Sequence, residues 1–102
     1  TALGYMAHGG HGCISVTANV APRLCAEFQN ACMAGDFAKA RLIQDQLTPL
    51  HDAMFCESSP APAKYGASVL GHCTDEVRLP IVSASEAARV RIREAMAHAG
   101  IA

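Results

Sequence analysis

The run GGHGCISVTANVAP, from Gly9 to Pro22, decides how the rest of the chain is interpreted. Its glycines stand before a β-branched stretch, whereas phosphate-binding loops place their glycines after a strand and at the start of a helix. The run is therefore not a phosphate cradle. It predicts a helix exit followed by a short strand over Cys13–Val16, buried on both faces because its apolar character is nearly continuous. No other stretch predicts a strand convincingly, and one strand cannot form a sheet.

Helices are predicted on both sides of this strand. Gly9 would end a first helix, and Pro22 suits the first turn of the next one. Asp36 can cap a longer helix. Within that helix, Pro49 removes the amide that would bond to the carbonyl of Asp45. The predicted helices span residues 1–8, 22–35, 36–56, 62–70 and 83–99.

Apolar residues recur at helical spacing in these segments and predict the core. In the last helix, Ser83 and Glu86 form a plausible capping box, and Gly100 would end the helix. The predicted buried positions are Leu24, Phe28 and Cys32 in the second helix, Leu42, Ile43, Leu47, Leu50 and Met54 in the third, and Ala88, Ile92, Ala95, Met96 and Ala99 in the last.

Composition indicates one globular domain within 102 residues, of which 51% are hydrophobic and 17% charged. Eight basic and nine acidic residues nearly cancel, so the charge indicates neither nucleic acid nor a membrane surface as a partner. Neither a membrane span nor a signal peptide is apparent, and we expect a cytoplasmic protein. The first residues already resemble the middle of an amphipathic helix, which predicts a piece of a longer protein.

The residues that could carry chemistry are few. His8 and His11 could share a metal, but the sequence nominates no third or fourth ligand, so we expect no metal site. Lys39 and Lys64 lie in polar surroundings and predict solvated amines rather than nucleophiles. The other histidines, His51, His72 and His98, are expected near helix ends or on the surface. The five cysteines are odd in number and contain no C-x-x-C pair, which predicts reduced thiols packed mostly in apolar surroundings.

The chain resembles the dihydrodipicolinate synthase family of pyruvate-dependent Schiff-base lyases. Three stretches carry the resemblance: GGHGCISVTANVAP, AGDFAKARLIQDQLTPLHDAMFCESSPAPAKYGASVLG and VRLPIVSASE. It covers the chain from Thr1 to Ala102 and corresponds to the C-terminal third of family members. The resemblance implies an α/β fold, the end of a (β/α)8 barrel over residues 1–35 and a C-terminal helical domain over residues 36–102. Within the chain it implies mostly helix with one short strand, and it implies a homotetramer.

The resemblance also implies an activity and implies which of its residues lie in this chain. Family members condense pyruvate with aspartate semialdehyde through a lysine Schiff base, in the biosynthesis of diaminopimelate and lysine, without a cofactor. The reactive lysine, its tyrosine relay and the threonines that bind the pyruvate carboxylate would precede Thr1. This chain would then hold no catalytic residue and be inactive alone. One binding position carries over: Ile14 would present its backbone carbonyl near the lysine, with Thr17 and Asn19 shaping the loop beside it.

Two departures from the family pattern leave alternatives open. Cys13 stands where the family commonly has valine, and Ser59 stands where it commonly has asparagine. N-acetylneuraminate lyase and the keto-deoxy sugar acid aldolases share the lysine chemistry, so the parent could be one of these aldolases. A third interpretation is a helical interaction module without catalysis, because most of the predicted elements are amphipathic helices.

Overall fold

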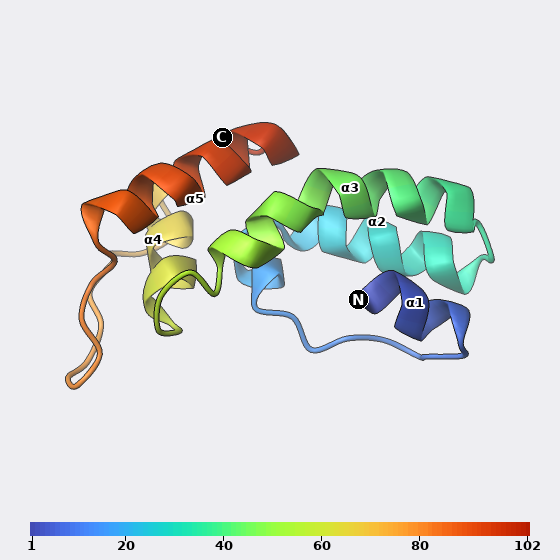
Figure 1. Cartoon of the computed structure of the whole chain (residues 1–102), viewed down its shortest axis with the longest axis horizontal. Helices are drawn as coiled ribbons and strands as arrows, with labels where there is room; N and C mark the ends of the chain where they lie inside the picture. Colours follow the sequence, from blue (N-terminus) through green and yellow to red (C-terminus); the bar gives the residue numbers. More distant parts are fainter.

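Five α-helices and one short 3-10 helix make up the regular structure of the chain. The computed structural model describes residues 1–102. The molecule is elongated, with extents of 41 × 25 × 21 Å, and α2 and α3 lie side by side while α4 and α5 occupy the other end (Figure 1). The elements are α1 (Ala2–Ala7), η1 (Thr17–Asn19), α2 (Pro22–Met33), α3 (Phe37–Ala53), α4 (Ala61–Val69) and α5 (Glu86–Ala99). The mostly helical character predicted from the sequence is confirmed.

Most helix ends lie where local residue chemistry places them. Pro22 occupies the first turn of α2, where its missing amide costs nothing. Gly35 and Gly100 follow α2 and α5 with φ of 76°, a left-handed conformation that favours glycine. The Asp36 side chain accepts a hydrogen bond from the Lys39 amide at 3.1 Å and caps α3. These boundaries confirm the sequence predictions.

The capping box predicted from Ser83 and Glu86 is wrong. The cap of α5 is Ser85, whose side chain accepts from the Ala88 amide at 3.2 Å. The carboxylate that completes this cap comes from Glu57, 28 residues earlier, and accepts from the Ser85 amide at 2.9 Å. A pattern confined to four neighbouring residues cannot detect a partner at that distance. Glu86 pairs instead with Arg93, at 3.4 Å.

The strand predicted over Cys13–Val16 is not formed. These residues belong to the irregular connection that runs from α1 to η1 (Figure 1). Cys13 is exposed and Ile14 is fully exposed, so the expected burial on both faces is also wrong for this structure. A strand needs a neighbouring strand to pair its amides and carbonyls. No other segment of the chain is a strand, so the pairing cannot occur within these 102 residues.

The core is centred on α3, which packs against α2 on one side and α5 on the other. The buried face of α5 includes the small side chains of Ala88, Ala95 and Ala99. Leu42, predicted in the core, is 67% exposed because it lies on the face of α3 turned away from both neighbours. The remaining predicted positions are buried, apart from the half-buried Leu24. The largest fully buried side chains include Leu47, Leu50 and Met54 of this central region and Ile92 and Met96 of α5.

Pro49 leaves an acceptor on α3 that α5 uses. The carbonyl of Asp45, which cannot receive an amide from Pro49, lies 3.4 Å from Nε2 of His98. One residue further along α3, Nε2 of the Gln46 side chain donates to the carbonyl of Ala99 at 2.6 Å. Two polar contacts from α3 therefore reach the last turn of α5, beside the buried apolar contacts between the helices.

Gly66 allows α4 to approach the residue that follows η1. A Cβ added to Gly66 would lie 2.9 Å from Cγ2 of Val20, closer than real Cβ atoms approach other atoms. Val20 is 2% exposed, and its branched side chain has little rotamer freedom. The spacing between α4 and the end of η1 therefore depends on the absence of a side chain at Gly66.

We predict that Gly66→Ala lowers the melting temperature of the protein that carries these residues. Alanine in place of glycine normally stabilises a helix by about 1 kcal/mol. Here the overpacking against Val20 costs about 1 to 3 kcal/mol, which outweighs that gain. Thermal unfolding followed by circular dichroism measures the difference.

Gly4→Ala is the matched control, because nothing lies within 4 Å of a Cβ at Gly4 in α1. It should leave the melting temperature unchanged or raise it. Adding Val20→Ala to Gly66→Ala should recover part of the loss. A Gly66→Ala protein as stable as the unmodified one would show that α4 moves away freely.

Candidate functional site

The candidate site is the place where the irregular segment 13–17 meets the second half of α3. A cavity of about 420 Å³ separates them and is open to solvent. The segment contributes the predicted binding residue Ile14, and α3 contributes polar groups. The cavity is lined by residues 13–17, by Thr1 and Ala2, and by Gln44, Thr48, His51, Asp52 and Phe55.

A hydrogen bond between Thr17 and His51 crosses this site. Oγ1 of Thr17 lies 2.6 Å from Nδ1 of His51, and the tautomer of the ring decides which group donates. Thr17 is only 1% exposed, so its hydroxyl is removed from bulk water. A buried hydroxyl without a partner would be costly, and His51 provides the partner. The bond joins residues 34 positions apart in the sequence.

The surroundings of His51 favour its neutral form. Burial lowers the pKa of the imidazole below its usual value, and Asp52 opposes this effect. Sequence reasoning placed His51 near a helix end and Thr17 in the loop, but it did not pair them. Nothing in the local pattern of either residue signals a contact between them.

The residues next to Thr17 are held by local hydrogen bonds. The Asn19 side chain donates to the carbonyl of Val16 at 3.0 Å, and the Ala18 amide donates to Oγ of Ser15 at 3.2 Å. Asn19 therefore bonds to nearby backbone within the loop. No hydrogen bond of the structure uses the carbonyl of Ile14, which remains a free acceptor three residues before Thr17.

A second cavity, of about 260 Å³, lies on the other side of His51, between the same segment and α2. Its walls are mainly apolar and include Cys13, Cys25 and Phe28. Two amide oxygens near the cavities, those of Gln29 and Gln44, are buried without a hydrogen-bond partner. Buried polar atoms normally have a hydrogen-bond partner, so these two unpartnered oxygens are exceptions.

The cysteines and the other candidate residues do not form a second centre of chemistry. All five thiols are free: Cys13 and Cys73 are exposed, whereas Cys25, Cys32 and Cys56 are partly or fully buried. Burial raises the pKa of Cys25 and of Cys32, which keeps these thiols protonated and weakly nucleophilic.

The predicted histidine pair and the lysines lie apart from the site. No three metal-binding side chains gather in the structure, and His8 and His11 are both exposed. Lys39 is exposed on α3, and Lys64 is half-buried on α4. His72 is exposed in the connection after α4, and His98 lies in the last turn of α5. None of these side chains lines either of the two cavities.

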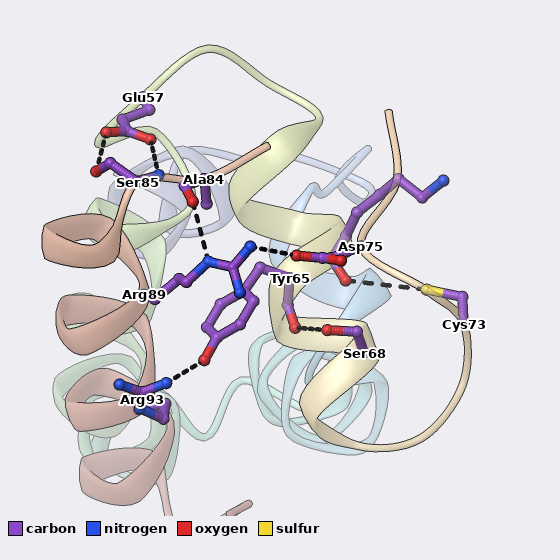
Figure 2. A network of polar contacts seen from close by, with 10 residues as sticks. Glu57, Tyr65, Ser68, Cys73, Asp75, Ala84, Ser85, Arg89 and Arg93 are labelled. Atoms are coloured by element: carbon purple, nitrogen blue, oxygen red, sulfur yellow. Dashed lines mark hydrogen bonds and ion pairs between the residues drawn. The ribbon is translucent and has the colours of Figure 1, made fainter. Parts of the chain in front are cut away.

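Away from the cavities, Glu57 in the middle of the α3–α4 connection binds the residue that precedes α5, Ser85 (Figure 2). Its carboxylate accepts from the amide of Ser85 at 2.9 Å and from the hydroxyl of Ser85 at 2.5 Å. These two hydrogen bonds hold the pKa of Glu57 below its usual value. Glu57 opens the ESSPAPAK stretch, so this motif contributes a cap to a helix that begins 29 residues after it, at Glu86.

Two arginines of α5 surround Tyr65 of α4, as Figure 2 shows. The guanidinium carbons of Arg89 and Arg93 lie 4.9 and 5.9 Å from the centre of the ring, and Arg93 also donates to the phenol oxygen. Arg89 pairs with Asp75 at 2.6 Å and donates to the carbonyl of Ala84 at 3.0 Å. These contacts join α4 and the connection after it to α5, and they form a structural cluster.

No helix in the structure combines the length and the apolar character that crossing a lipid bilayer requires.

Comparisons with known proteins match the chain almost from end to end. A sequence model of the Dihydrodipicolinate synthetase family matches residues 1–99. The 4-hydroxy-tetrahydrodipicolinate synthase of Afipia carboxidovorans is 62% identical over 99% of this chain and 34% of its own length. The synthase of Rhizobium meliloti is 61% identical over 99% of this chain and 35% of its own length. The chain thus spans about a third of the length of the curated relatives it matches.

Solved structures agree with these matches. Chloride-inhibited dihydrodipicolinate synthase from Acinetobacter baumannii, complexed with pyruvate, superposes with a TM-score of 0.94 at 36% identity, over 100% of this chain and 35% of that one. Dihydrodipicolinate synthase from Thermotoga maritima superposes with a TM-score of 0.93 at 34% identity, over 98% and 34% of the two chains. The helical arrangement is therefore shared with the corresponding third of those proteins.

We predict that Glu57→Gln lowers the melting temperature near neutral pH and that the difference disappears in acid. Because folding lowers the pKa of Glu57, its stabilising contribution is present above the usual carboxyl value of 4.5. That contribution is lost as the pH falls through the lowered pKa of the folded protein. Thermal unfolding of both proteins at a series of pH values measures the difference.

Glu94→Gln is the control, since Glu94 is exposed on the same α5 helix and makes no hydrogen bond or ion pair. Its effect on the melting temperature should not follow the same pH dependence. If Glu57→Gln were equally destabilising at every pH, ionisation of the carboxylate would not be the origin of the cap's contribution.

Proposed function

The chain belongs to the Dihydrodipicolinate synthetase family, and we propose that it is the C-terminal third of a 4-hydroxy-tetrahydrodipicolinate synthase. That enzyme is a lyase which condenses pyruvate with aspartate semialdehyde in the biosynthesis of diaminopimelate and lysine. The observation that carries the proposal is the 62% identity to a synthase of that name, over 99% of the chain. The names of the matched relatives favour this synthase over the sugar-acid aldolases that share lysine chemistry.

We assign residues 1–35 to the end of a (β/α)8 barrel and residues 36–102 to the helical domain that follows it. Residues 13–16 would be the eighth barrel strand, whose pairing partners are the other strands of the barrel. The exposed Ile14 side chain supports this assignment, because a surrounding barrel would cover it. The unpartnered side-chain oxygens of Gln29 and Gln44 also support it, because a surrounding barrel would offer hydrogen-bond donors. Alone, the 102 residues would be inactive.

The chemistry of the proposed enzyme begins with an imine between pyruvate and a lysine outside this chain. Loss of a proton from the methyl group of the bound pyruvate gives an enamine, whose carbon attacks the aldehyde. The imine makes this possible because it stabilises the electron pair that a free carbanion would have to carry. No metal or organic cofactor is required for these steps, so we propose none.

Ile14 would serve this reaction through its main chain. Barrel enzymes gather their reacting groups at the carboxyl ends of the strands, and Ile14 belongs to the proposed eighth strand. Its carbonyl makes no hydrogen bond in the structure and is free to face the imine. Because the backbone carbonyl would contact the imine, the Ile14 side chain needs only to pack.

We further propose a cytoplasmic homotetramer, with no nucleic acid and no membrane as partner.

We predict that the full-length protein containing these residues gains the mass of one reduced pyruvate adduct when it is treated with pyruvate and borohydride. Borohydride reduces the imine to a stable amine, so the adduct survives digestion and can be mapped by mass spectrometry. The modified lysine should lie outside the 102 residues.

The 102 residues expressed alone are the control and should gain no adduct under the same conditions. Omitting pyruvate should abolish the mass gain of the full-length protein. The absence of any adduct would contradict the imine mechanism, and an adduct on Lys39 or Lys64 would contradict the assignment of the reactive lysine to another part of the protein.

A further inference from the structure

The irregular segment that carries Ile14 needs an external support near its end. Residues 13–16 form no ladder within the chain, and the local hydrogen bonds of Ser15, Val16 and Asn19 turn the chain without fixing it to another helix. Thr17 is the first residue of η1 and is 1% exposed, so it is the point at which the segment becomes buried. It lies three positions after Ile14, which is a reach of at most about 10 Å in an extended chain.

His51 supplies that support from α3. Its Nδ1 lies 2.6 Å from the Thr17 hydroxyl, at a depth where the hydroxyl has little access to water. The helix behind it is firmly held, because Leu47, Leu50 and Met54 around His51 are 0 to 1% exposed. Displacing the histidine would therefore require repacking of the core, and the position of Thr17 is set by the helical domain.

His51 also lies beside the segment that carries Ile14. It lines both cavities that border the segment 13–17, on the side of α3. A hydrogen bond with fixed geometry at Thr17 restricts how the preceding residues can rotate. Ile14, whose carbonyl is proposed to face the imine, is one of these preceding residues.

We propose that His51 is a positioning residue of the synthase: through its hydrogen bond to Thr17 it fixes the direction in which the carbonyl of Ile14 points at the pyruvate imine. This inference rests on the proposed function of the chain. It assigns to the C-terminal helical domain a part in the reaction that is separate from covering the barrel.

The test uses the full-length enzyme and two matched pairs of variants. Thr17→Val removes the hydroxyl at nearly constant shape, whereas Thr17→Ser keeps it. His51→Asn places an amide near the position of Nδ1, whereas His51→Gln places its amide beyond it, near Nε2. We expect Thr17→Val and His51→Gln to lower kcat/KM for pyruvate about tenfold, and Thr17→Ser and His51→Asn to stay near the unmodified enzyme.

A merely structural role would lower the melting temperature without this kinetic pattern. Thr17→Val combined with His51→Gln should cost no more than the worse single change, because both remove the same bond. His72→Gln, an exposed histidine outside the site, is the control and should leave kcat and KM unchanged.

Two results would overturn the inference. One is a kcat/KM for pyruvate within twofold of the unmodified enzyme in both Thr17→Val and His51→Gln. The other is an equal loss in His51→Asn and His51→Gln, which would assign the effect to packing. Because all four variants are judged against an unmodified enzyme that forms the borohydride adduct, these failures differ from failure of the proposed function, in which that enzyme forms no adduct.

Discussion

The structure depends on the packing of α3 between two partners. Its buried face contacts α2 on one side and α5 on the other, and Leu47, Leu50 and the adjoining Met54 are almost wholly removed from water. The other helices contact α3 or one of its two neighbours, α2 and α5. A region that buries large side chains on two sides resists displacement, because interiors are close-packed and any shift leaves cavities. This rigidity makes α3 a suitable base for the contacts at its ends.

Two polar contacts between distant residues extend the order of α3 into the irregular parts of the chain. Glu57, just beyond the helix, caps α5 through Ser85, and His51, near its end, binds the buried hydroxyl of Thr17. Both occur where a backbone or side-chain group would otherwise lack a partner. The first orders the start of the last helix, and the second orders the end of the segment that carries Ile14. The apolar core thus fixes how the helices pack, and these hydrogen bonds fix the segments attached to them.

Membership of the Dihydrodipicolinate synthetase family gives this arrangement a context. In the proposed enzyme, the chain would contribute a strand, a free main-chain carbonyl and a helical domain, while the reactive amine would belong to the preceding part of the protein. The exposed Ile14 and the two open cavities are then understandable as surfaces that face the barrel. The chemistry would be shared between segments that are far apart in sequence and close together only in the folded enzyme.

The sequence by itself determined the helices, most of their ends and most of the core, because capping residues, glycines and apolar spacing act over a few neighbouring positions. It misplaced the cap of α5 and the exposure of Leu42, it predicted a buried strand over residues 13–16 that this chain does not form, and it did not detect the contact between Thr17 and His51. Each of these features depends on which distant segment lies beside the residues concerned. Glu57 lies beside the cap of α5, α2 and α5 lie beside α3, and in the proposed barrel other strands would lie beside residues 13–16. Only the tertiary structure decides such neighbours, since contact across 28 or 34 residues leaves no periodic trace in the chain.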